Sequence, residues 1–129
     1  MLLYVTVGTN NLERARAFYD PVLATLGLVR VATSGSELGY GAESGDEALF
    51  WVNYPYDKQE ASHGNGSMIA FAANGRAAVS AFHAAALLYG GRDEGAPGLR
   101  AYSPHFFAAY VRDPDGNKLS AVFDRPEPV

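Results

Sequence analysis

Few residues of this chain are of the types that carry out acid–base, nucleophilic or metal chemistry. There is no cysteine, which excludes disulfides, thiolate zinc sites and thiol nucleophiles together. The three histidines are His63, His83 and His105, and no two of them have the i,i+4 spacing of a metal-binding helix. We find no nucleophile–base–orienter trio and no phosphate-binding glycine loop. The residues alone therefore identify no catalytic reaction.

One group of polar side chains is nevertheless close together in the sequence. Arg100, Tyr102 and His105 fall in or just after a segment that glycine and proline interrupt, residues 92–103. We predict that they border a pocket, where Arg100 could pair with an anionic ligand. The chain is also rich in aromatic residues, with seven Phe, eight Tyr and one Trp. A pocket of aromatic rings with a few hydroxyl groups suits planar or apolar ligands.

The elements that must position these residues form a repeat. Residues 4–27 align with residues 68–91 at an offset of 64, which places Tyr4-Val5-Thr6-Val7 on Met68-Ile69-Ala70-Phe71, Ala17-Phe18 on Ala81-Phe82 and Gly27 on Gly91. One offset thus aligns a β-like run, a helical run and the glycine that ends the helix. Such self-similarity is typical of a fold built from copies of one unit. We expect a pseudo-symmetric pair of modules.

Each copy is predicted to contain strands and one helix in the order β-α-β-β-β. In the first module, residues 1–55, a helical pattern follows the first of four strands, which are expected at 2–8, 28–33, 37–42 and 47–53. In the second module, residues 67–125, the segment 92–103 holds one irregular strand, and the other strands are expected at 67–73, 106–112 and 118–123. Residues 54–66 are the predicted linker. The expected fold class is α+β, with residues 1–129 as a single domain.

The last two predicted strands are joined by a strong hairpin sequence, Asp113-Pro114-Asp115-Gly116-Asn117. The tandem modules, this hairpin and the helix sequence NLERARAFYDPVLATLGL together resemble the vicinal oxygen chelate superfamily. That superfamily includes glyoxalase I, extradiol dioxygenases, and fosfomycin- and bleomycin-resistance proteins. The resemblance covers nearly the whole chain and is greatest to short, glyoxalase-like bacterial proteins. It implies that each module curls its sheet into a half-barrel and that two concave faces meet at a shared cavity.

The resemblance also implies four metal-ligand positions, on the first and last strands of each module, which His, Gln or Glu usually occupy. They map to Tyr4, Met68 and Ser120, and in the first module to Phe50, or to Trp51 if the alignment slips by one residue. None of these side chains is a usual ligand of Zn, Ni, Mn or Fe. We therefore expect no metal and no cofactor. The expected ligand pocket is lined by Tyr4, Thr6, Phe50, Trp51, Met68, Arg100, Tyr102, His105 and Ser120.

Composition narrows the classes of partner. The formal charge of −4, with no basic stripe, argues against nucleic-acid binding. No apolar run reaches the roughly 18–20 residues that cross a bilayer, and the first residues lack the pattern of a signal peptide. We expect a cytoplasmic protein that does not bind a membrane. A homodimer is expected as well, because open half-barrels leave sheet edges and an apolar helix face to cover.

The resemblance implies a glyoxalase- or dioxygenase-like protein that binds a small molecule without the metal of the family and whose reaction is undefined. Two alternatives stay open. In one, the chain sequesters a drug without catalysis, as bleomycin-resistance proteins do, and its acidity suits a cationic ligand. In the other, it is a metal-dependent lyase or dioxygenase with ligands that the alignment misses.

Overall fold

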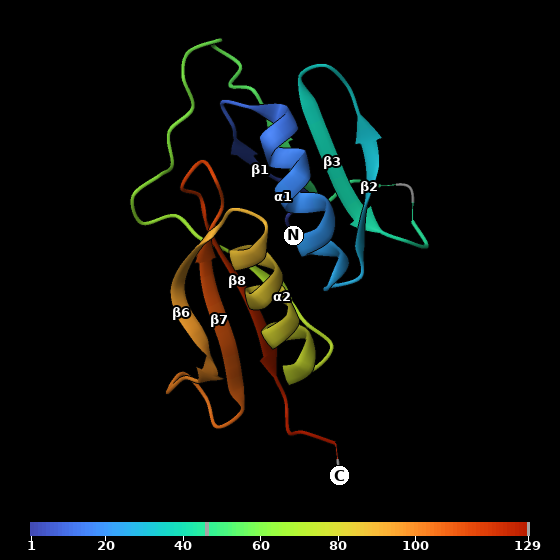
Figure 1. The fold of residues 1–129 in the computed structure, drawn as a ribbon. Coiled ribbons are helices and arrows are strands. Elements are labelled where there is room, and N and C mark those ends of the chain that lie inside the picture. Colours follow the sequence, from blue (N-terminus) through green and yellow to red (C-terminus); the bar gives the residue numbers. More distant parts are fainter. Residues whose placement is uncertain (46, 129) are drawn as a thin grey trace.

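The computed structural model describes residues 1–45 and 47–128, and two βαβββ modules follow one another along them (Figure 1). The first module consists of β1 (Val5–Gly8), α1 (Leu12–Ala24), β2 (Leu28–Thr33), β3 (Glu37–Ala42) and β4 (Phe50–Asn53). The second consists of β5 (Ile69–Ala72), α2 (Arg76–Leu88), β6 (Arg92–Leu99), β7 (Phe106–Arg112) and β8 (Lys118–Asp124). The predicted α+β class and the tandem modules are confirmed.

The repeat seen in the sequence extends to the bounds of the elements. Strand β1 spans 5–8 and β5 spans 69–72, while α1 spans 12–24 and α2 spans 76–88, so both pairs keep the offset of 64. The glycines that end the helices do not keep this offset. Gly27 after α1 and Gly90 after α2 have left-handed backbone conformations, with φ of 76° and 103°, whereas Gly91, which aligns with Gly27 in the sequence, does not. The offset changes in the last two strands, because β6 and the turn after it are longer than β2 and its turn.

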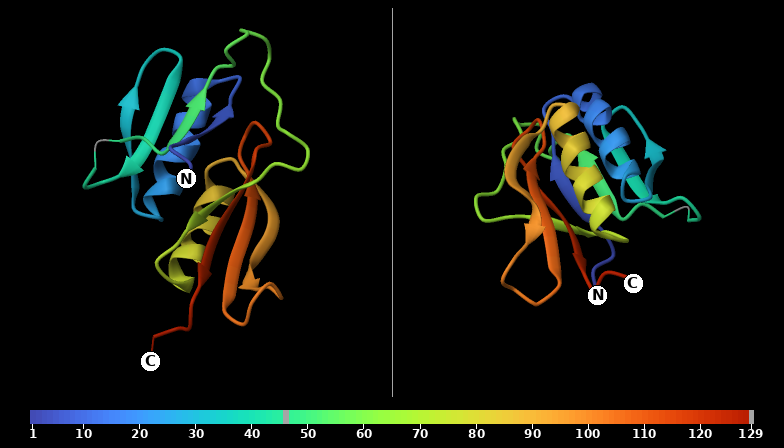
Figure 2. Two further views of the ribbon diagram at one scale, coloured as in Figure 1. Left: turned by 180° about the vertical axis from the view of Figure 1, so that it is seen from behind. Right: turned by 60° about the horizontal axis from the view of Figure 1, so that its bottom comes forward.

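Each module forms one four-stranded sheet, in the strand order β1-β4-β3-β2 and β5-β8-β7-β6. Helix α1 packs on the first sheet and α2 packs on the second, and the two helices also contact each other. The right-hand view of Figure 2 shows the helices side by side on the same side of the two sheets. The opposite face of each sheet carries no helix of the described chain, and we call it the helix-free face. None of the described helices is long and apolar enough to span a bilayer.

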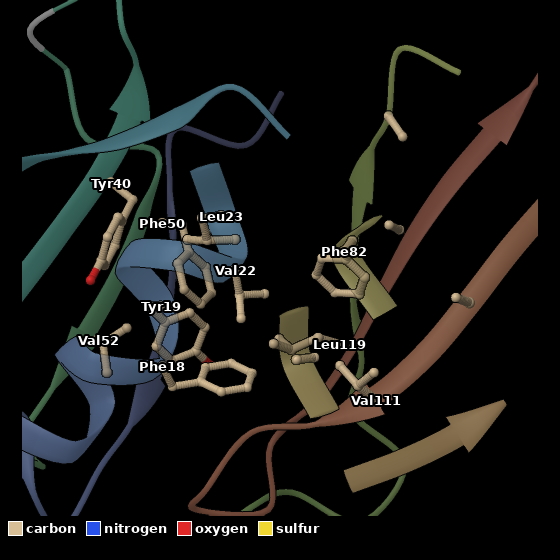
Figure 3. Packing of buried hydrophobic residues seen from close by; sticks show 14 of the residues in the cluster. Phe18, Tyr19, Val22, Leu23, Tyr40, Phe50, Val52, Phe82, Val111 and Leu119 are labelled. Atoms are coloured by element: carbon tan, nitrogen blue, oxygen red, sulfur yellow. The ribbon is translucent and has the colours of Figure 1, made fainter. Parts of the chain in front are cut away.

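The two modules share one hydrophobic core on the helix-bearing faces of their sheets. Figure 3 shows Phe18 and Val22 of α1 facing Phe82 and Leu119 of the second module, and all four side chains are fully buried. The ring of Phe50 lies 5.2 Å from the ring of Phe71, which joins the two sheets directly. Burial of a side chain of this size contributes about 1.5–3 kcal/mol. The modules therefore stabilise each other.

The hairpin between β7 and β8 forms a second connection between the modules. Oδ1 of Asp113 accepts hydrogen bonds from the backbone N–H groups of Asp115 and Asn117, each at 2.9 Å. Oδ2 accepts from Nδ2 of Asn117 at 2.9 Å and from the hydroxyl of Tyr19 on α1. Both Tyr19 and Asp113 are buried. The carboxylate thus closes its own turn and binds a helix of the other module.

Asp115 extends this connection to the beginning of α1. Its carboxylate accepts from Oγ1 of Thr9 at 2.5 Å and from the backbone N–H of Asn10 at 3.0 Å. It also pairs with Nη2 of Arg14 at 2.6 Å. A negative charge before the first turn of a helix is favourable, because the backbone N–H groups there carry partial positive charge. The sequence DPDGN therefore connects the two modules through hydrogen bonds and an ion pair, in addition to forming the turn.

Burial raises the pKa of the Asp113 carboxyl above its ordinary value, although the hydrogen bonds from Tyr19 and Asn117 act in the opposite direction. Burial and the nearby Asp113 carboxylate also raise the pKa of Tyr19 well above its usual value. The folded protein therefore holds the Asp113 proton more tightly than the unfolded chain does. The contribution of this carboxyl to the free energy of unfolding is greatest in acid and falls as the pH rises through the raised pKa.

Candidate ligand-binding site

The helix-free face of the second sheet carries alternate residues of β7 and β8. Along β7, Phe107, Ala109 and Val111 point into the core, so the residues between them point to the opposite face. Those residues are Phe106, Ala108, Tyr110 and Arg112. Tyr110 lies opposite Ser120 of β8, and Ser120 lies opposite Ala70 of β5. The same alternation therefore places Lys118, Ser120 and Val122 on this face.

A hollow of about 670 Å³ lies on this face, and the linker residues before β5 form one of its walls. Its volume is within the range of roughly 300–1,000 Å³ that is usual for small-molecule sites. The rings of Tyr102 and Phe106 meet edge to face, with their centroids 5.0 Å apart. The hollow is lined by Asn65, Gly66, Ser67, Met68, Tyr102, Phe106, Tyr110, Arg112 and Lys118.

Cationic side chains surround the ring of Tyr110 in this hollow. Lys118 Nζ lies 5.6 Å from the ring centroid, and the guanidinium carbon of Arg100 lies 5.3 Å from it. Arg100 also donates from Nη2 to the carbonyl of Ala96 at 2.6 Å, which holds it against the ring. Arg112 pairs through Nε with Glu94 at 2.9 Å. The site thus combines aromatic surface with positive charge.

Over β3, the helix-free face of the first sheet is covered by other residues of the first module. A Cβ atom on Gly39 would lie 2.8 Å from the Cβ of Ala48 and 2.8 Å from the ring of Trp51. A Cβ atom on Gly41 would lie 2.1 Å from the carbonyl oxygen of Glu47. These glycines therefore let Glu47, Ala48 and the Trp51 ring lie directly on the sheet. The two modules share a fold but present different faces.

The predicted pocket residues are distributed over several places. Met68 and Tyr102 line the hollow of the second sheet, and Arg100 supports its wall. Thr6 and Met68 line an adjoining hollow of about 450 Å³ between β1 and the linker. Tyr4 is exposed just before β1, and His105 is half-buried just before β7. Ser120 is fully buried, and its hydroxyl has no hydrogen-bond partner in the described chain.

The strand pairing resolves the choice between Phe50 and Trp51. Thr6 pairs with Trp51 as Ala70 pairs with Ser120, so Trp51 is the counterpart of Ser120. Phe50 instead points into the core, where its ring lies 5.2 Å from that of Tyr19. The alignment that gave Phe50 as a pocket residue is therefore corrected by one position. A slip of one residue moves a side chain to the opposite face of a sheet.

Seven residues that line the hollow were not among the predicted pocket residues, and for four of them the sequence contained a signal. Phe106, Tyr110, Arg112 and Lys118 all lie in predicted strands and were not assigned to a face. Counting in steps of two from Ser120 places Lys118 on the same face, and strand pairing across the short hairpin adds the alternate residues of β7. The loop wall, by contrast, has no periodic pattern that could have identified Asn65 or Gly66.

Comparisons with known proteins agree with this architecture. Residues 1–120 match the family described as Glyoxalase/Bleomycin resistance protein/Dioxygenase superfamily. A crystal structure of a glyoxalase/bleomycin resistance protein from Albidiferax ferrireducens is 41% identical, with a TM-score of 0.85, over 98% of this chain and 99% of that chain. No curated protein matches the chain. The chain belongs to the Glyoxalase/Bleomycin resistance protein/Dioxygenase superfamily, which confirms the resemblance seen in the sequence.

More distant structures share the fold alone. A glyoxalase-related enzyme from Fulvimarina pelagi is 19% identical, with a TM-score of 0.72, over 95% of this chain and 87% of that chain. A glyoxalase/bleomycin resistance protein/dioxygenase family enzyme from Burkholderia phytofirmans gives the same identity and TM-score, over 95% of this chain and 98% of that chain. The tandem arrangement of modules is thus retained at low sequence identity.

Proposed function

We propose that this chain is a metal-independent, small-molecule-binding member of its superfamily and that the hollow on the second sheet receives the ligand. The observation that carries the proposal is the contrast between the two helix-free faces. Over β3 the first face is covered by Ala48 and Trp51, whereas over β7 and β8 the second has a hollow of ligand size lined by aromatic and polar side chains. Apolar walls with a few polar groups are typical of small-molecule sites.

The donor set supports metal independence. By the mapping that the resemblance implies, with Trp51 in place of Phe50, the ligand positions of the family hold Tyr4, Trp51, Met68 and Ser120, which offer a phenol, an indole, a thioether and a hydroxyl group. This set does not fit Zn, Ni, Mn or Fe, which take imidazole, carboxylate or thiolate ligands. Among residues 1–45 and 47–128, no three His, Cys, Asp or Glu side chains come together as a metal site.

Binding can be followed at a single methyl group. The chain has two methionines, Met1 and Met68, and only Met68 lines the hollow. With methyl-labelled methionine, we expect hits from a fragment library to shift the Met68 signal and to leave the Met1 signal unchanged. A library that leaves the Met68 signal unchanged in the folded protein contradicts the proposed site.

The same preparation tests metal independence. We expect elemental analysis to find less than about 0.1 equivalent of any transition metal, and binding of the fragment hits to be unchanged by a chelator, because the donor set holds no ion tightly. A stoichiometric metal that is lost together with ligand binding would support the alternative of a metal-dependent enzyme.

We further propose that two copies of the chain pair. Each sheet has open edge strands, and large apolar side chains outside the ligand hollow are exposed, among them Leu2, Leu3 and Leu88. Open sheet edges and exposed apolar side chains are commonly covered in an interface. We expect light scattering at tens of micromolar to give twice the chain mass of 13.8 kDa. A mass of one chain under these conditions contradicts the dimer.

A further inference from the structure

We infer that the hollow on the second sheet selects an anionic aromatic molecule, a planar ring that carries a carboxylate, and that Lys118 is the cation that meets the carboxylate. This inference rests on the proposed binding function, and it adds the chemical class of the ligand. It arises from the charges of the lining, the free ammonium group of Lys118 and the exposed rings beside it.

The lining of this hollow is positive in a protein that is negative overall. The formal charge of the chain is −4, yet the described residues of the lining include Arg112 and Lys118 and no Asp or Glu. The hollow beside Thr9 contains Glu60 as well as Lys58, and the hollow beside β5 contains Asp124 as well as Arg125. A recess walled by one sign of charge concentrates ligands of the opposite sign.

The three cations near Tyr110 are not equally available. Arg112 is compensated by Glu94 at 2.9 Å and donates from Nη1 to the carbonyl of Gly116 at 2.9 Å. Arg100 is held by the carbonyl of Ala96 and does not line the hollow. Lys118 makes no ion pair and no side-chain hydrogen bond within the described chain, so its ammonium group keeps all three donors. The uncompensated positive charge of Lys118 therefore matches a ligand with one carboxylate.

The aromatic part of the ligand is indicated by the rings beside Lys118. Tyr102 is 79% exposed, although it meets Phe106 edge to face. The exposed Met68 side chain adds polarisable apolar surface at the same hollow. A flat aromatic ring that covers these side chains would remove apolar surface from water while its substituent reaches Lys118. A cationic drug would instead meet like charge, which disfavours the cationic ligand suggested by the overall acidity.

Three probes that share a naphthalene ring and carry substituents of similar size but different charge test the role of charge in binding. They are naphthalene carboxylate, naphthalene carboxamide and aminomethylnaphthalene, each titrated into the full chain while the Met68 methyl signal is recorded. We expect the carboxylate to bind about tenfold more tightly than the carboxamide, because a hydrogen bond to a charged group is worth more than a neutral one. The amine is expected to bind most weakly.

Matched variants assign the selectivity to Lys118. Lys118→Met keeps the apolar stem and removes the charge, so its affinity for the carboxylate should fall to that for the carboxamide. Lys118→Arg should retain the preference. Lys58 is the other lysine of the chain and lines a different hollow, so Lys58→Met is the matched control and should leave the preference unchanged.

The outcomes distinguish this inference from the proposed function. Equal affinities for carboxylate and carboxamide, both with a shift of the Met68 signal, overturn the inference and leave the binding site in place. A preference for the carboxylate that survives in Lys118→Met also overturns it. If none of the three probes shifts the Met68 signal while library fragments of other chemistry do, the inference fails alone. If neither the three probes nor any library fragment shifts the Met68 signal, the inference and the proposed function fail together.

Discussion

Replacement of Asp113 by alanine is expected to lower the free energy of unfolding by about 3 kcal/mol, because it removes a buried acceptor from several donors at once. The carboxylate accepts from two backbone N–H groups, from Asn117 Nδ2 and from the hydroxyl of Tyr19. After truncation the fully buried Tyr19 hydroxyl loses its acceptor. Urea denaturation followed by circular dichroism measures the change.

Two further variants identify the cause of this loss. Tyr19→Phe removes one donor and its need for an acceptor together, so it should cost about 1 kcal/mol and should make part of the loss in Asp113→Ala disappear in the double variant. Asp57→Ala is the control, because Asp57 accepts one backbone hydrogen bond in an exposed loop. Equal losses for Asp57→Ala and Asp113→Ala would contradict the role of the hairpin.

Replacement of Phe50 by glutamate and replacement of its neighbour Trp51 by glutamate are expected to have opposite effects on folding. Phe50 is 2% exposed and lies between Tyr19 and Phe71, so Phe50→Glu buries a carboxylate without a partner and should prevent folding. Trp51 is half-buried on the helix-free face, and Trp51→Glu can direct its charge to solvent. We expect Trp51→Glu to fold with a loss of about 1–3 kcal/mol.

Circular dichroism and thermal melting of the two variants provide the measurement. An unfolded Trp51→Glu beside a native-like Phe50→Glu would show that the faces of β4 are assigned the wrong way round. The neutral pair Phe50→Leu and Trp51→Leu is the control for size, because both variants should fold. The result also decides which residue a designer must change in order to place a carboxylate at this ligand position.

The sequence was sufficient for the architecture, because both modules keep their strand and helix periods at one offset. The bounds of β1 and α1 recur in β5 and α2 without a shift. The last strands of the two modules align in two registers, because β6 and its turn are longer than their counterparts and no sequence pattern shows where the added residues lie. A one-residue ambiguity was enough to exchange Phe50 and Trp51, which lie on opposite faces.

The site was predicted only in part for a similar reason. Met68 and Tyr102 were found because the repeat and the loop composition point to them. The hydrogen bond from Tyr19 to Asp113 joins residues 94 positions apart in the sequence, and a local sequence pattern contains no information about such a pair. The covered part of the first sheet depends on Ala48 and Trp51 lying against Gly39, which the sequence shows only as an unexplained glycine in a strand.

The hairpin of the second module also has a consequence for the order of folding during synthesis. Domains of larger proteins commonly fold as they leave the ribosome, with the N-terminal part first. Here Asp113, the acceptor for the Tyr19 hydroxyl of α1, is made 94 residues after Tyr19, and Asp115, the anchor for the first turn of α1, follows it. Because the first module lacks these partners until the second module has been made, we expect both modules to acquire their structure in one cooperative step rather than one after the other.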